Sequence, residues 1–562
     1  MRPILSSGRF FALLVILAGT GLVPRDLRAE QDVGGEANAG APGSQIHLPE
    51  ADVGRAVLYA FDDRAIAATG NLQLAMEAPE KYAGNPVLAI GRGGEPDEWQ
   101  LRFYGTILWN QGKFRMWYLA ASYEGFVTPW QGGGIDFRGW RVAYAESPDG
   151  LHWTKPDLGL MEFRGSRHNN LVGMPAGFHG YHALVRYEPE DPDPSRRFKM
   201  MAEVRLTGDY VIPGGGPEGA YVPLYSPDGL RWRLADELIP AQGKVISAGF
   251  HLVTSFEAAG FYKWQGMYYL SGQNYAKPRQ AAAMAPEGRH IQLYHSPDLI
   301  HWSQAQTMGY ARQGQFGIGA GADKEAGRVA YADEQTHEGA AVWDRGNVLL
   351  ALTGFWHGAR DWTKITHDLG FLISDDGLHY REPQPEFIFA RVGQKGRDWD
   401  YGGLAQGQAF ANVGDKTYVW YGAPMDQSEG PRTGRPFLRE GGVGLLTLGR
   451  DRFGSLSTRD PDQDGVLVTE KIRAERPAKI WVNAEGLGPD SPLRVELLDG
   501  QERPLAGYSG PAASVLDHSG LRLPVAWSPS SAATPPGPFK IQLRFEGPER
   551  NAIRFYAIYL GY

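Results

Sequence analysis

Four copies of one short motif constrain the fold of this chain more than any other feature. The first copy, residues 147–153, reads Ser-Pro-Asp-Gly-Leu-His-Trp, and related copies occupy 226–232, 296–302 and 374–380. Their first residues are 79, 70 and 78 positions apart, and a weaker fifth copy at 450–456 lies a similar distance further on. A regular period of this kind is typical of repeat architectures, so the repeat decides the fold class before any other signal.

Each copy follows a strand-like run and contains a hairpin-turn signal around its Asp. We expect this Asp to be structural rather than catalytic, because Asp caps its own turn through side-chain-to-backbone hydrogen bonds. The abundance of Gly (74), Pro (39), Tyr (26) and Trp (16) favours many short strands and turns over helices. Five units closed into a ring predict an all-β fold with a five-bladed β-propeller over residues 50–458.

The pattern changes after the last repeat. Residues 466–562 contain alternating apolar and polar runs separated by turns such as Asp499-Gly500. This pattern predicts a C-terminal β-sandwich. Residues 30–49 are rich in Gly and Ala, and we expect them to be a flexible segment.

The first 29 residues have the pattern of a signal peptide. Arg2 and Arg9 supply positive charge, and the apolar stretch 10–22 is too short to span a bilayer comfortably. We expect cleavage after Ala29, a secreted or periplasmic protein, and no membrane span after cleavage. The alternative is an uncleaved membrane anchor.

Charge and cysteine content exclude several classes of partner and chemistry. The net charge is -8 and there is no long Lys/Arg run, so we expect no nucleic-acid partner. The chain contains no cysteine, which excludes disulfides, Cys–zinc sites and thiolate nucleophiles. His179 and His182 are too isolated to predict a metal site, so we expect neither a metal nor a cofactor.

The motif at 296–302 resembles the Ser-x-Asp-Leu-x-x-Trp blade motif of the five-bladed propeller glycosidases, the superfamily of glycoside hydrolase families 32, 43, 62, 68, 117 and 130. A propeller followed by a sandwich is most similar to family 32. The resemblance implies a glycoside hydrolase whose partner is an oligosaccharide or polysaccharide.

The catalytic motifs of family 32 are not reproduced in this sequence. Asn85-Pro86 lacks the acidic nucleophile, and Arg459-Asp-Pro461 falls after the last blade. The family's catalytic residues therefore cannot be transferred by position. A non-catalytic propeller that binds glycan remains the alternative, and a lyase or other propeller chemistry is a third.

Candidate site residues follow from the architecture, because the innermost strand of each blade faces the central funnel. Glycosidases need two carboxyl groups, and Glu257 and Glu338 begin equivalent strands of two blades, so they form the first catalytic pair. Further polar or aromatic residues on these strands, or next to them, are the candidates for substrate binding: Arg102, Tyr104, His182, His337, Trp356 and Gln406.

Two more carboxylates are candidates for catalysis. Glu334 shares a strand face with Glu338, and neighbouring carboxylates raise one another's pKa, which keeps a general acid protonated. Asp400 precedes the fifth inner strand. The structural alternatives are that these carboxylates bond to neighbouring blades, and that Trp356 packs between blades instead of stacking on a sugar.

Overall fold

The computed structural model describes most of the chain after residue 55. The described ranges are 45–47, 56–123, 139–176, 178–239 without 207–219, 245–247, 252, 257–276, 288–303, 307–312, 335–357, 366–423, 439–527 and 533–562. Their regular elements are β-strands and short 3-10 helices, the latter being η2 (Pro194–Arg196), η3 (Asp236–Leu238), η6 (Gly510–Ala512) and η7 (Arg550–Ala552). Within these ranges, no helix has the length and apolar character needed to cross a membrane.

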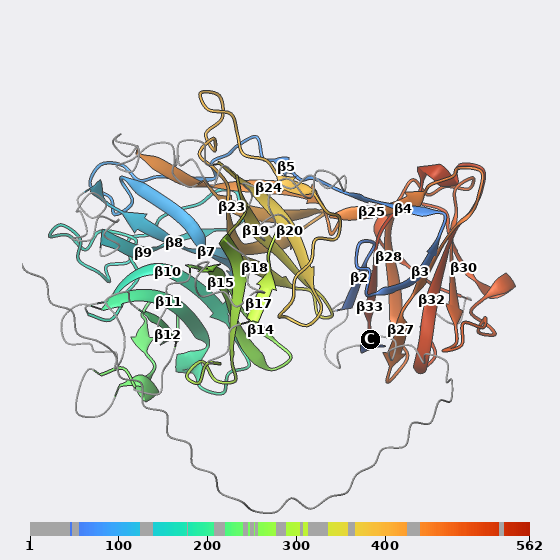
Figure 1. The fold of residues 1–562 in the computed structure, drawn as a ribbon, viewed down its shortest axis with the longest axis horizontal. Coiled ribbons are helices and arrows are strands. Elements are labelled where there is room, and N and C mark those ends of the chain that lie inside the picture. The colour runs from blue at the N-terminus through green and yellow to red at the C-terminus, as the bar shows by residue number, and fades with distance from the viewer. Residues whose placement is uncertain are drawn as a thin grey trace, which may run out of the picture. The chain divides into compact units, whose positions relative to one another are not determined.

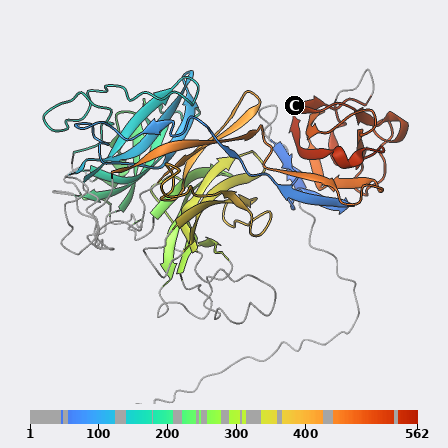
Figure 2. The same cartoon turned by 90° about the horizontal axis from the view of Figure 1, so that it is seen from above.

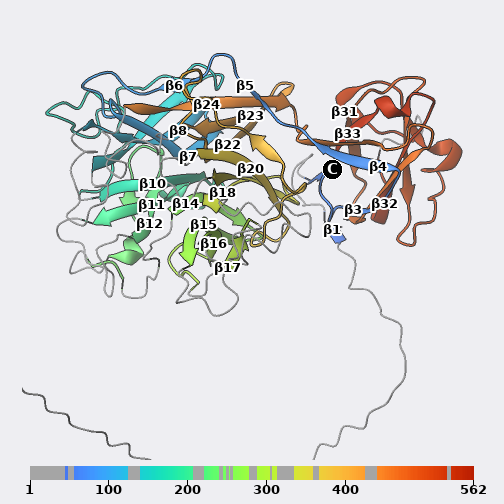
Figure 3. The same ribbon diagram turned by 45° about the horizontal axis from the view of Figure 1, so that its top comes forward.

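Three of the repeats form separate four-stranded antiparallel sheets, each in sequence order. The second repeat contains β10 (Phe178–Tyr187), β11 (Phe198–Leu206), β12 (Ala220–Ser226) and β13 (Arg233–Leu234). The third contains β14 (Glu257–Trp264), β15 (Met267–Ala276), β16 (Gly288–Ser296) and β17 (Thr307–Tyr310). The fourth contains β18 (Gln335–Asp344), β19 (Leu349–His357), β20 (Thr366–Ser374) and β21 (Ile388–Ala390). Figure 3 shows β10 to β12, and likewise β14 to β17, following one another outward from the inner strands.

The first and fifth repeats share one eight-stranded sheet. It contains β7 (Gln100–Asn110), β8 (Lys113–Ala121), β9 (Trp140–Ser147), β22 (Ala405–Val413), β23 (Lys416–Gly422) and β24 (Glu440–Gly449), with the short β5 (Glu80–Lys81) and β6 (Leu88–Ala89) paired to β24. The five inner strands contact one another in the closed order β7, β10, β14, β18, β22 and back to β7. The all-β propeller class is therefore confirmed. The number of separate blades stays a prediction, because two repeats are joined in one sheet.

The repeated motif is a turn held by its own Ser and Asp. In the first copy, Asp149 Oδ1 accepts hydrogen bonds from the backbone N–H groups of Leu151 and His152, both at 2.9 Å. The residue after the Asp has a left-handed backbone, with φ of 79° at Gly150 and 72° at Leu299, which replaces Gly in the third copy. The turn Asp is thus structural, as the sequence predicts.

Aromatic side chains tie each of three turns to the preceding repeat in the ring. The Tyr262 hydroxyl of the third repeat donates to Gly377 O of the fourth at 2.6 Å. Trp117 Nε1 in the first repeat donates to Gly229 O of the second at 2.8 Å. Trp420 Nε1 in the fifth repeat donates to Gly150 O of the first at 2.9 Å, so the same contact joins the end of the ring to its beginning. Repetition of one motif therefore builds the interfaces between repeats as well as the turns.

Two further sheets enclose the sandwich core. One contains β1 (Gln45–His47), β3 (Ile66–Gly70), β26 (Gly465–Thr469), β27 (Lys471–Ala474), β29 (Leu493–Leu498), β30 (Ser514–Leu516) and β32 (Gly537–Phe545). The other contains β2 (Ala56–Tyr59), β4 (Leu72–Met76), β25 (Gly454–Thr458), β28 (Lys479–Glu485), β31 (Gly520–Pro524) and β33 (Arg554–Gly561). Inward residues such as Val495, Leu543 and Ile558 are fully buried between them.

The sandwich recruits strands from the start of the chain. The sequence places residues 50–458 in the propeller and 466–562 in the sandwich, but β2, β3, β4 and β25 pair with sandwich strands. Figure 1 shows the blue strands β2, β3 and β4 beside the red and orange strands, and Figure 2 shows the same neighbourhood from above. The boundary differs because strand pairing joins segments far apart in sequence, such as Val57 and Tyr559.

Candidate functional site

All five inner strands are interrupted at equivalent points by a β-bulge. The register with the second strand shifts between Arg102 and Thr106, Gly180 and Ala183, Ala258 and Gly260, His337 and Ala341, and Gln406 and Phe410. Bulges re-aim side chains and are common beside active sites. Near these bulges, polar side chains of the inner strands meet others from the second and third strands of the repeats. We call the nine residues the inner-strand cluster: Tyr104, His182, Glu257, His337 and Glu338 from the inner strands, and Glu203, Gln273, Arg289 and His367 from the second and third strands.

At their bulges, the third and fourth repeats approach each other so closely that glycine is required. A Cβ on Gly260 would lie 1.9 Å from the backbone oxygen of Ala340, and one on Gly339 would lie 2.2 Å from that of Ser271. No side chain fits at such distances. The small residues of the inner strands therefore allow the neighbouring polar residues to meet.

His182 on β10 lies between two carboxylates and is fully buried. Its Nδ1 is 2.9 Å from Glu203 Oε2, and its Nε2 is 3.7 Å from Glu338 Oε2. Burial alone would lower the pKa of His182, but the contacts with Glu203 and Glu338 outweigh it and raise the pKa to about 10. His182 is therefore an imidazolium at neutral pH.

Glu338 is the central carboxyl group of the inner-strand cluster. It is 2% exposed, and its φ of 57° lies in the left-handed region that non-glycine residues seldom adopt. Within the described residues, no hydrogen bond reaches its Oε2 atom. Burial raises the pKa of Glu338 to about 7; His182 and Arg102 oppose this shift, and the negative charge of Glu257 adds to it. At neutral pH a large fraction of Glu338 therefore carries a proton.

Gln273 on β15 connects Glu338 to Glu257. The Gln273 amide nitrogen donates to Glu257 Oε2, while its oxygen accepts from the backbone N–H of Glu338 at 2.8 Å. Glu257 begins β14 and is half-buried. The two glutamates of the expected catalytic pair thus belong to one hydrogen-bonded unit and differ in exposure.

His337 on β18 is held as a neutral imidazole. Its Nδ1 lies 2.9 Å from Arg289 Nη1 and its Nε2 lies 3.1 Å from the Tyr104 hydroxyl. Because arginine only donates, Nδ1 must accept and the proton of the neutral ring belongs on Nε2. Burial, His367 and Arg289 together hold the pKa of His337 well below its usual range. The Nε2–H group also lies 3.8 Å from Glu338 Oε1.

Aromatic rings form one wall of the inner-strand cluster. His367 on β20 is fully buried, and its ring centroid is 4.3 Å from that of His337 and 4.9 Å from that of Trp356. Burial and the charge of Arg289 lower the pKa of His367 to about 3, so it is neutral. Trp356 is 4% exposed and the Arg289 guanidinium lies 3.6 Å from its ring centroid. Trp356 therefore packs within the wall, and its face toward Arg289 is covered.

Gln406 and Arg102 support the inner-strand cluster from β22 and β7. Gln406 Nε2 donates to the backbone oxygens of His337 and Gly339, at 2.6 and 2.8 Å, and so fixes the bulge that carries Glu338. Arg102 is 7% exposed, its guanidinium lies 5.1 Å from the Trp140 ring centroid, and its charge lowers the pKa of Glu338. Gln406 thus fixes the backbone that carries Glu338, and Arg102 affects the charge state of Glu338.

Asp400 has a different setting. It is 1% exposed, forms an ion pair with Lys81 at 2.6 Å and accepts a hydrogen bond from Tyr421 at 2.8 Å. These contacts join the segment before β22 to β5 and β23. In the described part of the chain, none of its hydrogen bonds or ion pairs involves the inner-strand cluster. Glu334 lies outside the described residues.

Four cluster residues were missed by the sequence argument: Glu203, Gln273, Arg289 and His367. All four lie on second or third strands of their repeats rather than on inner strands. A partial signal was present for the first two, since Glu203 and Gln273 each follow a run of mainly apolar residues in a second strand. Across the described residues, no group of three or more His, Asp or Glu side chains is arranged to hold a metal ion.

Comparison with known proteins gives structural likeness without sequence likeness. No family model matches the chain, and no curated protein matches it. Similar solved structures include a protein described as a glycoside hydrolase, with 12% identity, 67% of this chain and 94% of that chain covered, and a TM-score of 0.41. A glycoside hydrolase family 43 arabinoxylan arabinofuranohydrolase from Bacillus subtilis has 12% identity, 86% and 99% coverage and a TM-score of 0.34. A family 32 β-fructofuranosidase from Bombyx mori has 11% identity, 86% and 94% coverage and a TM-score of 0.31.

Proposed function

We propose that the protein is a glycoside hydrolase whose active site is the inner-strand cluster. The observation that supports this most strongly is the state of Glu338, a buried carboxyl group with a pKa of about 7 beside an imidazolium. A general acid works best when its pKa lies near the working pH. Two carboxyl groups in unlike environments are also the usual arrangement for acid and base roles.

In this mechanism Glu338 donates its proton to the glycosidic oxygen as the bond to the leaving group breaks. The imidazolium of His182, 3.7 Å away, stabilises the carboxylate that remains. Glu257, the more exposed of the two glutamates, either takes a proton from the attacking water or attacks the anomeric carbon itself. The Nε2–H of His337 donates to the Tyr104 hydroxyl at 3.1 Å, and the proton of that hydroxyl would orient a sugar hydroxyl.

The substrate in this proposal is an oligosaccharide or polysaccharide, and the protein acts outside the cytoplasm. The charged, apolar and small-residue pattern of residues 1–29 supports export. Mass spectrometry of the protein recovered from the producing cells should find a mature N-terminus near Glu30. An intact Met1 would contradict export.

The test of the catalytic roles is a pair of amide substitutions assayed on nitrophenyl glycosides and neutral oligosaccharides. Glu338→Gln keeps the shape of the acid but removes the proton, and should lower turnover by about 10²–10⁴-fold. The loss should be larger for oligosaccharides than for activated aryl glycosides, whose leaving groups need little protonation. Glu257→Gln should lower turnover on both kinds of substrate.

The exposed Glu190→Gln provides the matched control, with thermal melting to verify folding. If Glu257 is the nucleophile, azide should restore turnover of an aryl glycoside to Glu257→Gly and yield a glycosyl azide. Wild-type turnover in both amide variants would overturn the proposal.

One observation favours the second candidate, a propeller that binds glycan without cleaving it. Glu338 is 2% exposed and Trp356 is 4% exposed, so two expected contact residues are closed to a ligand in this conformation. Glycan binding by the wild type with no turnover on any substrate of the panel would establish this candidate.

A further inference from the structure

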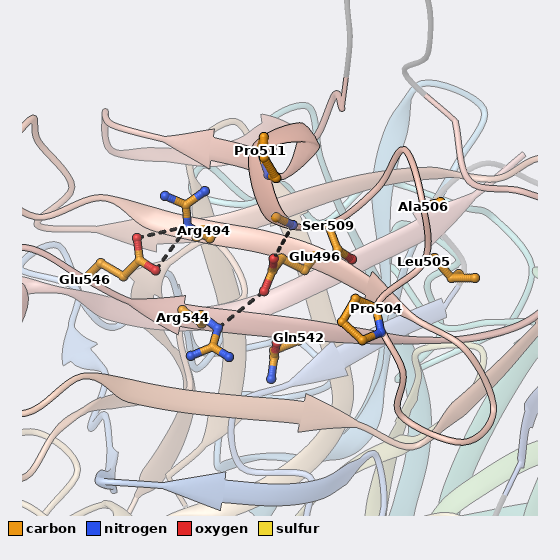
Figure 4. A pocket seen from close by; sticks show the side chains of 11 residues that line it. Arg494, Glu496, Pro504, Leu505, Ala506, Ser509, Pro511, Gln542, Arg544 and Glu546 are labelled. Atoms are coloured by element: carbon orange, nitrogen blue, oxygen red, sulfur yellow. Dashed lines mark hydrogen bonds and ion pairs between the residues drawn. The ribbon is translucent and has the colours of Figure 1, made fainter.

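The sandwich carries a hollow of about 730 Å³ that lies outside the inner-strand cluster. Its floor is the outer face of β29 and β32, and its side is the chain between Pro504 and Pro511 (Figure 4). A volume of this size is within the range of small-molecule sites. Five polar side chains form the floor: Arg494, Glu496, Gln542, Arg544 and Glu546.

The floor is arranged by the strand register. Arg494 pairs with Arg544, and Glu496 pairs with Gln542, across β29 and β32. Because side chains alternate along a strand, these four share the outer face while Val495 and Leu543 fill the core.

Each arginine of the floor is fixed by a carboxylate through Nε. Arg494 Nε donates to both oxygens of Glu546 at 3.0 Å, and Arg544 Nε donates to Glu496 Oε2 at 3.3 Å. Figure 4 shows the terminal nitrogens of Arg494 directed away from Glu546. Within the described residues, no hydrogen bond is formed by the terminal nitrogens of Arg494 and Arg544 or by the side-chain amide of Gln542. The two guanidinium groups are thus held through Nε while their terminal nitrogens have no acceptor in the described part of the protein.

The charges of the floor balance. Two guanidinium groups face two carboxylates, so the hollow offers no net charge to attract a phosphate, a polyanion or a cation. Planar guanidinium, carboxylate and amide groups with spare donors and acceptors match a ligand rich in hydroxyl groups.

The side of the hollow is apolar and held in position. Pro504, Leu505 and Pro511 line it. The Leu505 N–H donates to Leu497 O at 2.9 Å, and the Gly510 N–H donates to Glu496 Oε1 at 2.7 Å. A polar floor beside an apolar side suits a sugar ring, which has hydroxyls on its rim and C–H groups on its faces.

We propose that this hollow is a second saccharide-binding site, which takes an uncharged oligosaccharide and is separate from the inner-strand cluster. The site binds whether or not the propeller cleaves glycosidic bonds. It retains a chain on the sandwich and does no chemistry itself.

The test is affinity electrophoresis of the full-length protein in native gels that contain arabinoxylan, galactomannan, levan or polygalacturonate. At least one of the three neutral polysaccharides should retard the protein. Gln542→Ala and Arg544→Ala should each weaken that retardation at least tenfold in apparent affinity. Glu338→Gln should leave the Gln542-dependent retardation intact, which separates this site from the propeller site.

Arg473→Ala is the matched control, because Arg473 forms an exposed ion pair with Glu475 on the same sheet but does not line the hollow. It should not change retardation. Since the side-chain amide of Gln542 has no hydrogen-bond partner among the described residues, and its backbone stays in the sheet, Gln542→Ala should melt like the wild type. This variant therefore tests the site even if Arg544→Ala unfolds. The proposal fails if no neutral polysaccharide is retarded in a Gln542-dependent way, or if polygalacturonate alone is bound.

Discussion

Glu338 and Asp451 are both buried carboxyl residues with left-handed backbone, yet their surroundings are opposite. Asp451, which follows β24, is 1% exposed with φ of 59°. Four side chains donate to its two oxygens at 2.9–3.2 Å: Tyr59, Arg345, Asn412 and Tyr559. Glu338 has imidazole nitrogens at 3.7 and 3.8 Å, and no hydrogen bond to Oε2 within the described residues.

The difference shows how burial can serve two purposes. A buried carboxylate is stable as an anion when donors replace the water it has lost. Asp451 has these donors from both parts of the chain, since Arg345 and Asn412 belong to the propeller and Tyr59 and Tyr559 to the sandwich. Glu338 has instead two imidazole nitrogens at 3.7 and 3.8 Å, and burial raises its pKa to about 7. Four predictions test this comparison.

The largest effect should come from Asp451→Asn. The substitution removes the charge that offsets Arg345 at the junction between propeller and sandwich, and breaking a buried pair on one side costs about 3–5 kcal/mol. Urea unfolding should show this loss. The exposed Asp517→Asn should change little, and an Asp451→Asn protein as stable as the wild type would remove Asp451 from this role.

A smaller effect should appear in the pH dependence of stability. The folded-state pKa of Glu338 is raised from 4.5 to about 7, so the folded protein binds this proton more tightly than the unfolded chain. Its contribution is greatest below pH 4.5 and is lost as the pH rises toward 7, by roughly 3 kcal/mol at 1.36 kcal/mol per pH unit. The stability of the wild type relative to Glu338→Gln should fall across this window. A constant difference in unfolding free energy between pH 4.5 and 6.5 would contradict the raised pKa.

Glu203→Gln should change the charge state of His182. The pKa of about 10 depends on two carboxylates, and losing one should lower it by about one unit or more. The titration of His182 followed by NMR in histidine-labelled protein measures the shift. Tyr221→Phe is the control, because the Tyr221 hydroxyl is a neutral partner of the same ring at 3.1 Å. Equal midpoints in Glu203→Gln and the wild type would show that Glu203 does not set the charge.

The smallest effect should come from Tyr59→Phe. It removes one of the donors around Asp451, at 3.2 Å, and leaves the other three, so the cost should be about 1 kcal/mol. Chemical unfolding gives the loss in unfolding free energy for Tyr59→Phe. Comparison with the loss for Asp451→Asn shows what part of the stabilisation comes from the Tyr59 hydrogen bond. A loss as large as that of Asp451→Asn would mean that the network fails as a unit.

The propeller was predictable because its signal is local and repeated. The Ser-Pro-Asp-Gly turns place a cap, a left-handed glycine and an aromatic within seven residues, and the structure uses all three in that way. The assignment of β2 to β4 was not predictable from local pattern, because their partners lie hundreds of residues away. Leu299 was not predictable either, because it occupies the glycine position of the turn and adopts a φ of 72° that a leucine seldom has.

The candidate site was found in part, for a geometric reason. Counting one inner strand per repeat identified His182, His337 and Glu338, which the bulges bring together. The residues that set their charge, Glu203 and Arg289, lie on second and third strands. Whether these face the inner-strand cluster depends on strand register, which one sequence does not reveal. Asp400 is the opposite case. Its position before an inner strand made it a catalytic candidate, but in the structure it forms an ion pair with Lys81.

The pairing of the earliest strands with the latest ones has a consequence for synthesis. Ala56 on β2 pairs with Leu560 on β33, so one sheet of the sandwich cannot be completed until almost the whole described chain has left the ribosome. The strands β5 and β6 likewise cannot pair until β24 has been synthesised, about 350 residues later. Only then can the outer edge of the fifth repeat form. The nascent chain therefore carries unpaired strand edges throughout elongation, and in the cell these edges are candidates for protection by a chaperone until the final strand emerges.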